Sequence, residues 1–153
     1  MNSRPFFAKV SIAVCVCAFL TIGASSVRAL TSDGFSCSGI APVNKLVSLA
    51  GANISTAVIS PHGSLGGVVG IASSPKGCFN SSIQVTESGL QTCVFDSATT
   101  AGDYVNLSFS VDGDCHDAGT AYPTTGQVIG RVLSTNAVAG TYTIDLVPTE
   151  INL

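Results

Sequence analysis

The most polar stretch of the chain, Asp112 to Asp117, holds three carboxylates and one imidazole. Aspartates at alternate positions around a glycine can supply the oxygen ligands that Ca²⁺ prefers. We therefore predict a weak calcium site at Asp112, Asp114 and Asp117, although no Glu stands where an EF-hand loop needs one. The alternative is a turn in which these side chains accept backbone N–H bonds beside a disulfide. Apart from this Ca²⁺, the sequence predicts no cofactor.

A hydrolase would need an activated nucleophile. The segment around Ser64 resembles a nucleophile elbow, but His62 stands where that motif requires its first glycine. A set of Ser64, His116 and Asp117 has the right residue types, yet nothing in the spacing requires it. We therefore predict no catalytic residue and expect a protein that is not an enzyme, with a small secreted hydrolase as the least favoured alternative.

Four cysteines follow the N-terminal segment, at positions 37, 78, 93 and 115. In an exported chain an even number favours disulfides, and four cysteines allow three connectivities. We prefer Cys93–Cys115, which closes a strand-loop-strand segment, and this leaves Cys37–Cys78 to fix the N-terminal residues. A zinc site is the rival, but no C-x-x-C pair occurs and the chain has two histidines to assist.

The N-terminal residues have the composition of a secretory signal peptide. Arg4 and Lys9 precede an apolar run from Val10 to Ile22, and small residues follow it. We place cleavage after Ala29, with a site near Ser26 as the alternative. The run of 13 residues is short for a spanning helix, which needs roughly 20. We expect a mature chain that is secreted, extracellular or periplasmic, with no membrane span.

Removal of residues 1–29 leaves three bases, Lys45, Lys76 and Arg131, against nine acids, a net charge of −6. This balance opposes the basic footprint of a nucleic-acid-binding protein. Three sequons, at Asn53, Asn80 and Asn106, would carry glycans in a eukaryotic secretory pathway.

The mature chain is predicted to be all-β: an extended N-terminal arm over residues 30–42, then one β domain over residues 43–153. Short runs alternate apolar and polar residues, and no window has helical spacing. In Tyr104–Ser110, for example, Val105, Leu107 and Phe109 are expected to point inward. A single small barrel or sandwich of about eight strands is expected. The strands are Leu46–Ala50, Thr56–Ser60, Val68–Ala72, Ser82–Thr86, Gln91–Phe95, Tyr104–Ser110, Gln127–Leu133 and Thr141–Leu146.

A weak internal repeat aligns Val68–Ser74 with Val128–Ser134, and an alternating strand follows each copy. Thr56–Ser60 and Tyr104–Ser110 are candidates for the preceding strands, and 111–125, with Cys115, would then be an insert. Chance similarity of Val/Gly/Ser strings is the alternative. A true duplication favours a pseudo-symmetric barrel.

Two stretches carry a resemblance. From Gly67 to Thr86, and from Thr100 (T-A-G-D-Y-V) through G-R-V-L-S-T-N to Leu146, the chain resembles small β-barrel modules of bacterial secreted proteins and phage capsid-decoration proteins. The resemblance implies a small barrel and carries no catalytic residue. The chain departs from decoration modules in its predicted signal peptide and its four cysteines.

We therefore expect a secreted, non-enzymatic structural or adhesive surface module, such as a subunit of an appendage, matrix or coat. Its partner would be itself, another extracellular protein or a surface glycan, and not nucleic acid. The alternative is an extracellular carbohydrate- or calcium-binding protein that uses the loop 111–123. Tyr104, Tyr122 and Phe35 are the aromatic residues expected near its surface.

Overall fold

The computed structural model describes residues 31–39, 41–50 and 53–147, and this part of the chain holds nine β-strands and no helix. It therefore contains no helix long and apolar enough to cross a membrane. The all-β prediction is confirmed, whereas the predicted signal peptide lies outside the described residues. The strands are β1 (Thr31–Cys37), β2 (Leu46–Ala50), β3 (Asn53–Ile59), β4 (Val68–Ala72), β5 (Ser82–Phe95), β6 (Tyr104–Leu107), β7 (Cys115–Asp117), β8 (Gly130–Val132) and β9 (Gly140–Leu146).

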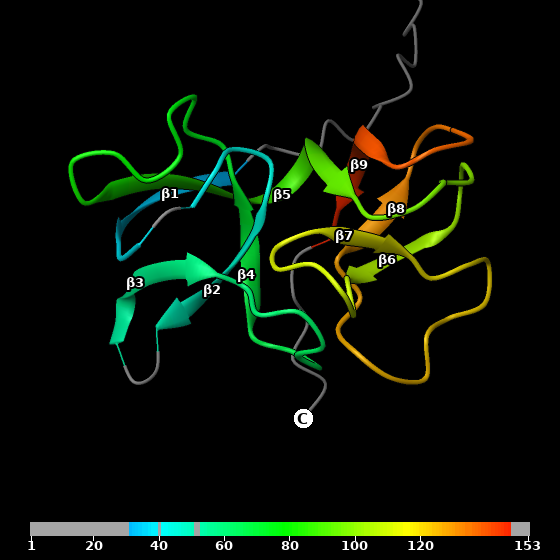
Figure 1. The fold of residues 1–153 in the computed structure, drawn as a ribbon, viewed down its shortest axis with the longest axis horizontal. Coiled ribbons are helices and arrows are strands. Elements are labelled where there is room, and N and C mark those ends of the chain that lie inside the picture. The colour runs from blue at the N-terminus through cyan, green and yellow to red at the C-terminus, as the bar shows by residue number, and fades with distance from the viewer. Residues whose placement is uncertain (1–30, 40, 51–52, 148–153) are drawn as a thin grey trace, which may run out of the picture.

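The first five strands form barrel A, on the left of Figure 1. β1 pairs antiparallel with residues 82–88 of β5 and, over two residue pairs, parallel with β3. β3 then pairs with β2, β2 with β4, and β4 with β5, all antiparallel. The expected N-terminal arm, 30–42, thus contains a strand that is paired within its own chain.

The remaining strands form barrel B, on the right of Figure 1. Residues 89–95 of β5 pair antiparallel with β9, β9 with β8, β8 with β6 and β6 with β7. β7 returns to β5 through one parallel pair, Phe95 with Cys115. The two strands expected at Ser82–Thr86 and Gln91–Phe95 are therefore one continuous strand that both barrels share.

Both barrels have the same topology, repeated in chain order. β1, β2, β3, β4 and the first half of β5 correspond in turn to the second half of β5, β6, β7, β8 and β9. The registers agree as well: Val47 pairs with Gly70, and Val105 pairs with Gly130. Loop contacts also recur. Asn44 N donates to Ala72 O at 2.8 Å, and the counterpart of Asn44, Gly102, donates its N–H to Val132 O at 2.8 Å. The predicted duplication is therefore present in the structure.

Each copy of the aligned repeat begins with a V-x-G-x motif, Val68–Ile71 and Val128–Arg131, and its glycine is required for the same steric reason in both. A Cβ on Gly70 would lie 2.3 Å from the carbonyl oxygen of Thr86, and a Cβ on Gly130 would lie 2.3 Å from that of Asp145. Real side chains do not tolerate such a distance to backbone, so each site needs a glycine for the neighbouring strand to approach.

Two details of the predicted repeat are wrong. The alignment of Val68–Ser74 with Val128–Ser134 is correct, since it superimposes β4 on β8. However, the counterpart of β6 is β2, and Thr56–Ser60 overlaps β3, whose counterpart is β7. Cys115 begins β7 and so belongs to the repeat, not to an insert.

The inward pattern expected for Tyr104–Ser110 holds for its first half. Val105 and Leu107 are buried, but β6 ends at Leu107 and Phe109 is exposed. Ser108 is fully buried because its hydroxyl donates to Asp96 and accepts from two backbone N–H groups of the next turn. A local hydrogen-bonded turn thus ends the strand, and with it the alternation of inward and outward side chains that the sequence predicts to Ser110.

Both predicted disulfides are confirmed, Cys37–Cys78 and Cys93–Cys115. Cys93–Cys115 crosses the short parallel contact between β5 and β7 in barrel B. Cys37–Cys78 ties the end of β1 to the β4–β5 loop in barrel A. Two disulfides are compatible with an oxidising compartment.

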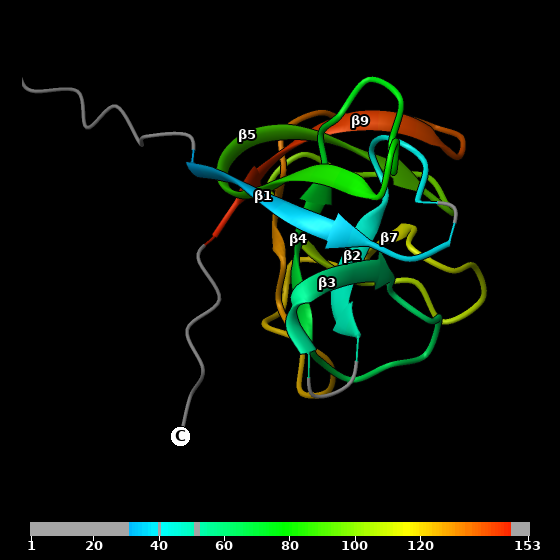
Figure 2. The same ribbon diagram turned by 90° about the vertical axis from the view of Figure 1, so that its left-hand side faces the viewer.

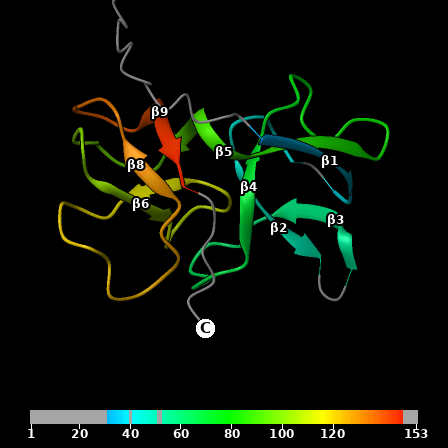
Figure 3. The same cartoon turned by 180° about the vertical axis from the view of Figure 1, so that it is seen from behind.

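The junction between the barrels is apolar. Leu46, Val68 and Ile71 come from β2 and β4 of barrel A, yet they pack in the same buried cluster as the barrel B residues Phe95 and Leu107. A second cluster fills barrel A itself. The β2/β4 side of barrel A therefore faces the β5/β7 side of barrel B, as Figures 1 and 3 show from front and back.

Candidate functional site

The three carboxylates of the predicted calcium site go to different places. Asp112 accepts the backbone N–H of His62 at 2.8 Å and lies 2.5 Å from its Nδ1. Asp114 forms an ion pair with Lys45. The carboxylate of Asp117 accepts backbone N–H groups of the β5–β6 loop at 2.7 Å and of the turn after β7 at 2.9 Å. Within the described ranges, no group of three or more His, Cys, Asp or Glu side chains is placed to hold a metal ion.

Asp117 accepts a backbone N–H group within its own turn, as the alternative expects, whereas Asp112 accepts one from a distant loop and Asp114 pairs with Lys45. Hydrogen bonds from the backbone and the ring of His62 keep the pKa of Asp112 below its ordinary value. The pair joins the β3–β4 loop of barrel A to the β6–β7 loop of barrel B. A hydrogen bond from Gly63 N to Ser108 O, at 3.0 Å, runs beside it.

The structure does not bring Ser64, His116 and Asp117 together as a catalytic set. His116 and Asp117 are neighbours in β7, so their side chains point to opposite sides of the strand. Nδ1 of His116 instead lies 2.9 Å from Asp96, and Ser108 Oγ donates to the other oxygen of Asp96 at 2.6 Å. The carboxylate stands between the serine and the histidine, whereas a triad needs the histidine between the other two.

The Asp96 cluster was not predicted, since its members lie 12 and 20 positions away from it in sequence. Burial alone would raise the pKa of Asp96. Hydrogen bonds from Ser108, His116 and Ser97, together with the charge of His116, outweigh it and lower the pKa. The cluster thus holds an ionised carboxylate that fixes the β6–β7 turn.

The β6–β7 loop locks the barrels together. Leu46 N donates to Gly113 O at 2.7 Å, and Gly113 N donates to Ser60 O at 2.9 Å. A Cβ on Gly113 would meet three atoms of barrel A within 3.0–3.2 Å, so glycine permits this close approach. The polar stretch that suggested a ligand site is therefore a contact between barrels.

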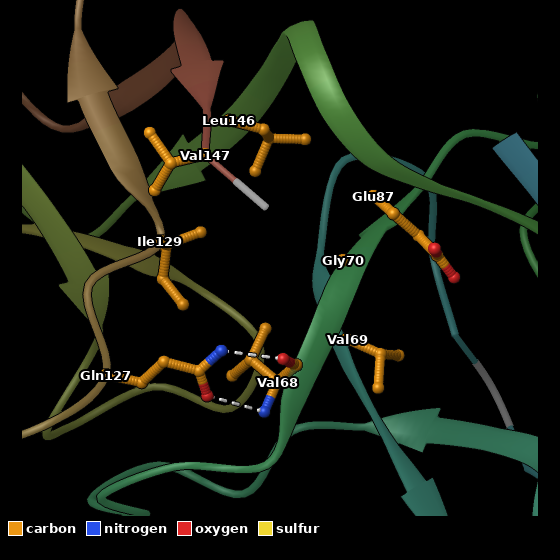
Figure 4. Close-up of a pocket in the computed structure, with 8 residues that line it drawn as sticks. All are labelled: Val68, Val69, Gly70, Glu87, Gln127, Ile129, Leu146 and Val147. Carbon is orange, nitrogen blue, oxygen red and sulfur yellow. Dashed lines mark hydrogen bonds between the residues drawn. The ribbon is translucent and has the colours of Figure 1, made fainter. Parts of the chain in front are cut away.

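A second contact comes from Gln127. Its side-chain amide accepts from Val68 N at 3.0 Å and donates to Val68 O at 2.8 Å, as a neighbouring strand would (Figure 4). Gln127, Val68 and Ile129 line a hollow at the junction with room for about one water molecule, about 10 Å³. Its small size and mostly apolar lining point to packing between barrels and not to ligand binding.

The β6/β8 side of barrel B carries an aromatic and charged cluster, which we call the distal face: Tyr104, Tyr122 and Arg131. The Arg131 guanidinium lies over the Tyr104 ring, 3.3 Å from its centroid, and donates to Gly102 O at 2.6 Å. Tyr122 meets the same ring edge-on at 5.2 Å and remains 61 % exposed. Exposed tyrosine and arginine side chains of this kind are typical of surfaces that bind other proteins.

Next to this face, Asp103 is 6 % exposed and one of its carboxylate oxygens is buried with no hydrogen-bond partner. Burial and the neighbouring Asp117 carboxylate raise the pKa of Asp103, and Arg131 partly opposes this. The two carboxylates lie 14 positions apart, and no motif indicates that they meet. The pairing of Val105 with Asp117 brings them together.

Of the predicted sequons, Asn80 lies at an exposed turn with a positive φ of 51°, whereas Asn106 is buried in β6. The side chain of Asn53 lies outside the described residues. A glycan on folded protein would thus fit at Asn80 and not at Asn106.

The fold defines a class: a small all-β protein of two five-stranded barrels that share one long strand. No family model matches the chain, and no curated protein matches it. Among solved structures, it is similar to the N base of the head fiber protein gp8.5 of bacteriophage phi29. The TM-score is 0.53 and the identity 14 %, and the match covers 82 % of this chain and 100 % of that one. At this identity the likeness concerns the fold, and it agrees with the resemblance to phage structural modules.

Proposed function

We propose that this protein is a secreted, non-enzymatic structural or adhesive surface module, a subunit of an appendage, matrix or coat. The observation that carries the proposal is the double-barrel fold, which is shared with the base of a phage head fiber over that chain's whole length. Fold likeness alone does not transfer function, so the proposal rests also on how this chain uses its own polar and apolar residues.

The polar side chains that could take part in catalysis have structural roles, which supports the proposal. Asp112, Asp114 and Gly113 bind barrel A to barrel B, and Asp96 and His116 hold a turn. A nucleophile beside a free base, which hydrolysis would require, does not occur among these clusters of the described chain.

The apolar surface supports contact with a partner. Leu65 on the β3–β4 loop and Phe109 and Val111 on the β6–β7 loop are large apolar side chains that remain exposed, at 65 %, 52 % and 41 %. The two loops lie side by side, joined by the hydrogen bond from Gly63 to Ser108. Apolar side chains gathered on adjoining loops are typical of interaction sites.

The test is to locate the protein where it is made. The producing cells would be fractionated and imaged with gold-labelled antibody, and the N-terminus of the exported chain would be read by mass spectrometry. The proposal predicts a chain that starts after Ala29 and is held on a cell surface, matrix or particle. Recovery as free protein in the medium, bound to no surface or particle, would contradict it.

The variant Phe109→Ser sharpens this test, because it removes an exposed ring without touching the core. It should lower the bound fraction, whereas Val138→Ser, which alters an even more exposed apolar residue on the β8–β9 loop, should leave it unchanged. Equal behaviour of both variants would count against contact through the β3–β4 and β6–β7 loops.

A further inference from the structure

The repeat places the two barrels head to tail. Barrel A contacts barrel B through its β2/β4 side, and barrel B contacts barrel A through its β5/β7 side. By the topological correspondence, β6/β8 is the counterpart of β2/β4, and β5/β7 is the counterpart of β1/β3. The two sides left free are thus β1/β3 at one end of the molecule and β6/β8 at the other (Figures 1 and 2). These are the counterparts of the two sides that already bind each other within the chain.

We infer that copies of this chain associate head to tail, with the β6/β8 side of one copy receiving the β1/β3 side of the next. The inference rests on the proposed function, since it names a second copy as the partner of a structural module. Such an interface is heterologous, so each copy keeps one free end and the stack can extend or close into a ring.

The side chains at the free β6/β8 side are those of a contact surface. Leu46 and Ile71 of barrel A, which are fully buried against barrel B, have Tyr104 and Arg131 as their counterparts. Tyr122 adds a third large side chain. Tyrosine and arginine are the residue types that contribute most often to binding energy at protein interfaces.

The β1/β3 side complements the distal face in size. The outward residues of β1 are small and exposed: Ser32, Gly34 and Ser36. They correspond to Leu90, Thr92 and Val94 on β5, and in this part of the chain Thr92 and Val94 already contact barrel A, both through Asn44. A surface of small residues leaves room for the two tyrosines.

A buried carboxylate beside the distal face points the same way. Within the chain the equivalent junction already uses an ion pair, Lys45 with Asp114. The counterpart of Lys45 is Asp103, which has a buried oxygen with no donor in the single copy. In barrel A the charged side chain at this position has a partner from the neighbouring barrel. In barrel B the side chain at the same position has no neighbouring barrel to supply one.

The test uses one variant for each end, made in the exported full chain with both disulfides formed. Tyr122→Asp alters the distal face, and Ser36→Arg places a positive charge on β1 opposite Arg131. Val138→Asp is the matched control, since Val138 is similarly exposed but belongs to neither the distal face nor the β1/β3 side. Sedimentation velocity over a range of concentrations measures association of each protein alone and of the two end variants mixed in equal amounts.

We expect the original chain to form species larger than a dimer as concentration rises, and the control to do the same. Each end variant alone should associate at least about tenfold more weakly, the usual size of the loss when an interface tyrosine is removed. The mixture should recover dimers and nothing larger, because each variant retains one intact end. Circular dichroism and a melting curve confirm that both variants are folded.

Two results would overturn the inference. One is a chain that stays monomeric at all concentrations, and the other is association that neither end variant weakens. In both cases the proposed function still stands if the protein is found bound to a surface or particle, since another protein or a glycan would then be the partner. A protein found bound to no surface or particle would instead contradict the proposed function itself.

Discussion

Barrel A and barrel B share every strand pairing but differ in what closes each ring. In barrel B the disulfide Cys93–Cys115 crosses the parallel contact between β5 and β7. The register puts Phe35 and Ala57 at the corresponding positions of barrel A, where no crosslink is present. The same topology is thus reached with and without this disulfide. Strand pattern and the glycine of each V-x-G-x motif specify the ring, and the disulfide adds stability to it.

The barrels differ equally on their outer sides. Leu46 and Ile71 make the β2/β4 side of barrel A apolar, and barrel B covers it. Tyr104 and Arg131 at the same positions of barrel B form a face that another barrel does not cover in the single chain. An internal repeat therefore shows which residues serve an interface, because the fold itself tolerates both sets.

The largest effect is expected from removing the disulfide of barrel B. Cys93→Ala with Cys115→Ala should lower the free energy of unfolding by about 3–5 kcal/mol, from the lost crosslink and the cavity left by two fully buried sulfurs. Cys37→Ala with Cys78→Ala should cost less than this, about 2–4 kcal/mol, because Cys37 lies at the edge of the core. Urea unfolding measures both, and a greater loss in barrel A would contradict the comparison.

The next effect concerns the repeated glycines. Gly70→Ala and Gly130→Ala should each destabilise by about 2–4 kcal/mol, because the new Cβ forces two strands apart. Gly66→Ala is the control, since its Cβ would meet no atom closer than 3.9 Å. Similar losses at the two sites would confirm their equivalence in a urea titration. A neutral Gly130→Ala would show that β8 is not held against β9 as the repeat requires.

A smaller effect concerns how the free energy of unfolding depends on pH, and two carboxyl groups should contribute to it with opposite sign. The pKa of Asp96 is lowered, so its contribution is present above the ordinary Asp pKa, about 3.9, and is lost as pH falls through the folded value. The pKa of Asp103 is raised, so its contribution is present below about 3.9 and is lost as pH rises through its folded value.

Asp96→Asn should therefore destabilise the protein near neutral pH and have little effect in acid. Asp103→Asn should do the reverse and stabilise it near neutral pH, because an amide can donate to Asp117 without charge. Unfolding free energies across the acid range measure both. An Asp103→Asn variant that is less stable than the original protein at neutral pH would contradict this account of Asp103 and Asp117.

The smallest effect is expected from calcium. A ligand that binds the folded state raises the melting temperature. Since Asp112, Asp114 and Asp117 already have separate partners, we expect less than about 1 °C between Ca²⁺ and EDTA. A clear rise with Ca²⁺, lost in Asp112→Asn, would support the calcium site that the sequence predicts.

Much of the fold was readable from local pattern. Leu46–Ala50 and Val68–Ala72 have the predicted bounds, and both disulfides are paired as expected. The pattern did not reveal that β5 is continuous, because residues 87–90 pass from one barrel to the other and lose the alternation of a single sheet face. Gly89, with a φ of 89°, lies at this crossing.

The candidate site was less predictable, for a physical reason. The contacts of Asp96 with His116, and of Asp103 with Asp117, come from strand register and not from local spacing. The cluster of acids at 112–117 was conspicuous in sequence, but its members point to different partners. The correspondence of Tyr104 and Arg131 with Leu46 and Ile71 emerged only from the pairings of both barrels.

Electron microscopy of the purified, disulfide-bonded chain at high concentration tests the central claim most directly. A structural module built as an open head-to-tail repeat should appear as linear or ring-shaped stacks in which every copy points the same way. The barrels should follow one another through the same kind of contact within and between copies. Single particles throughout, or two-fold dimers joined through like faces, would contradict this account.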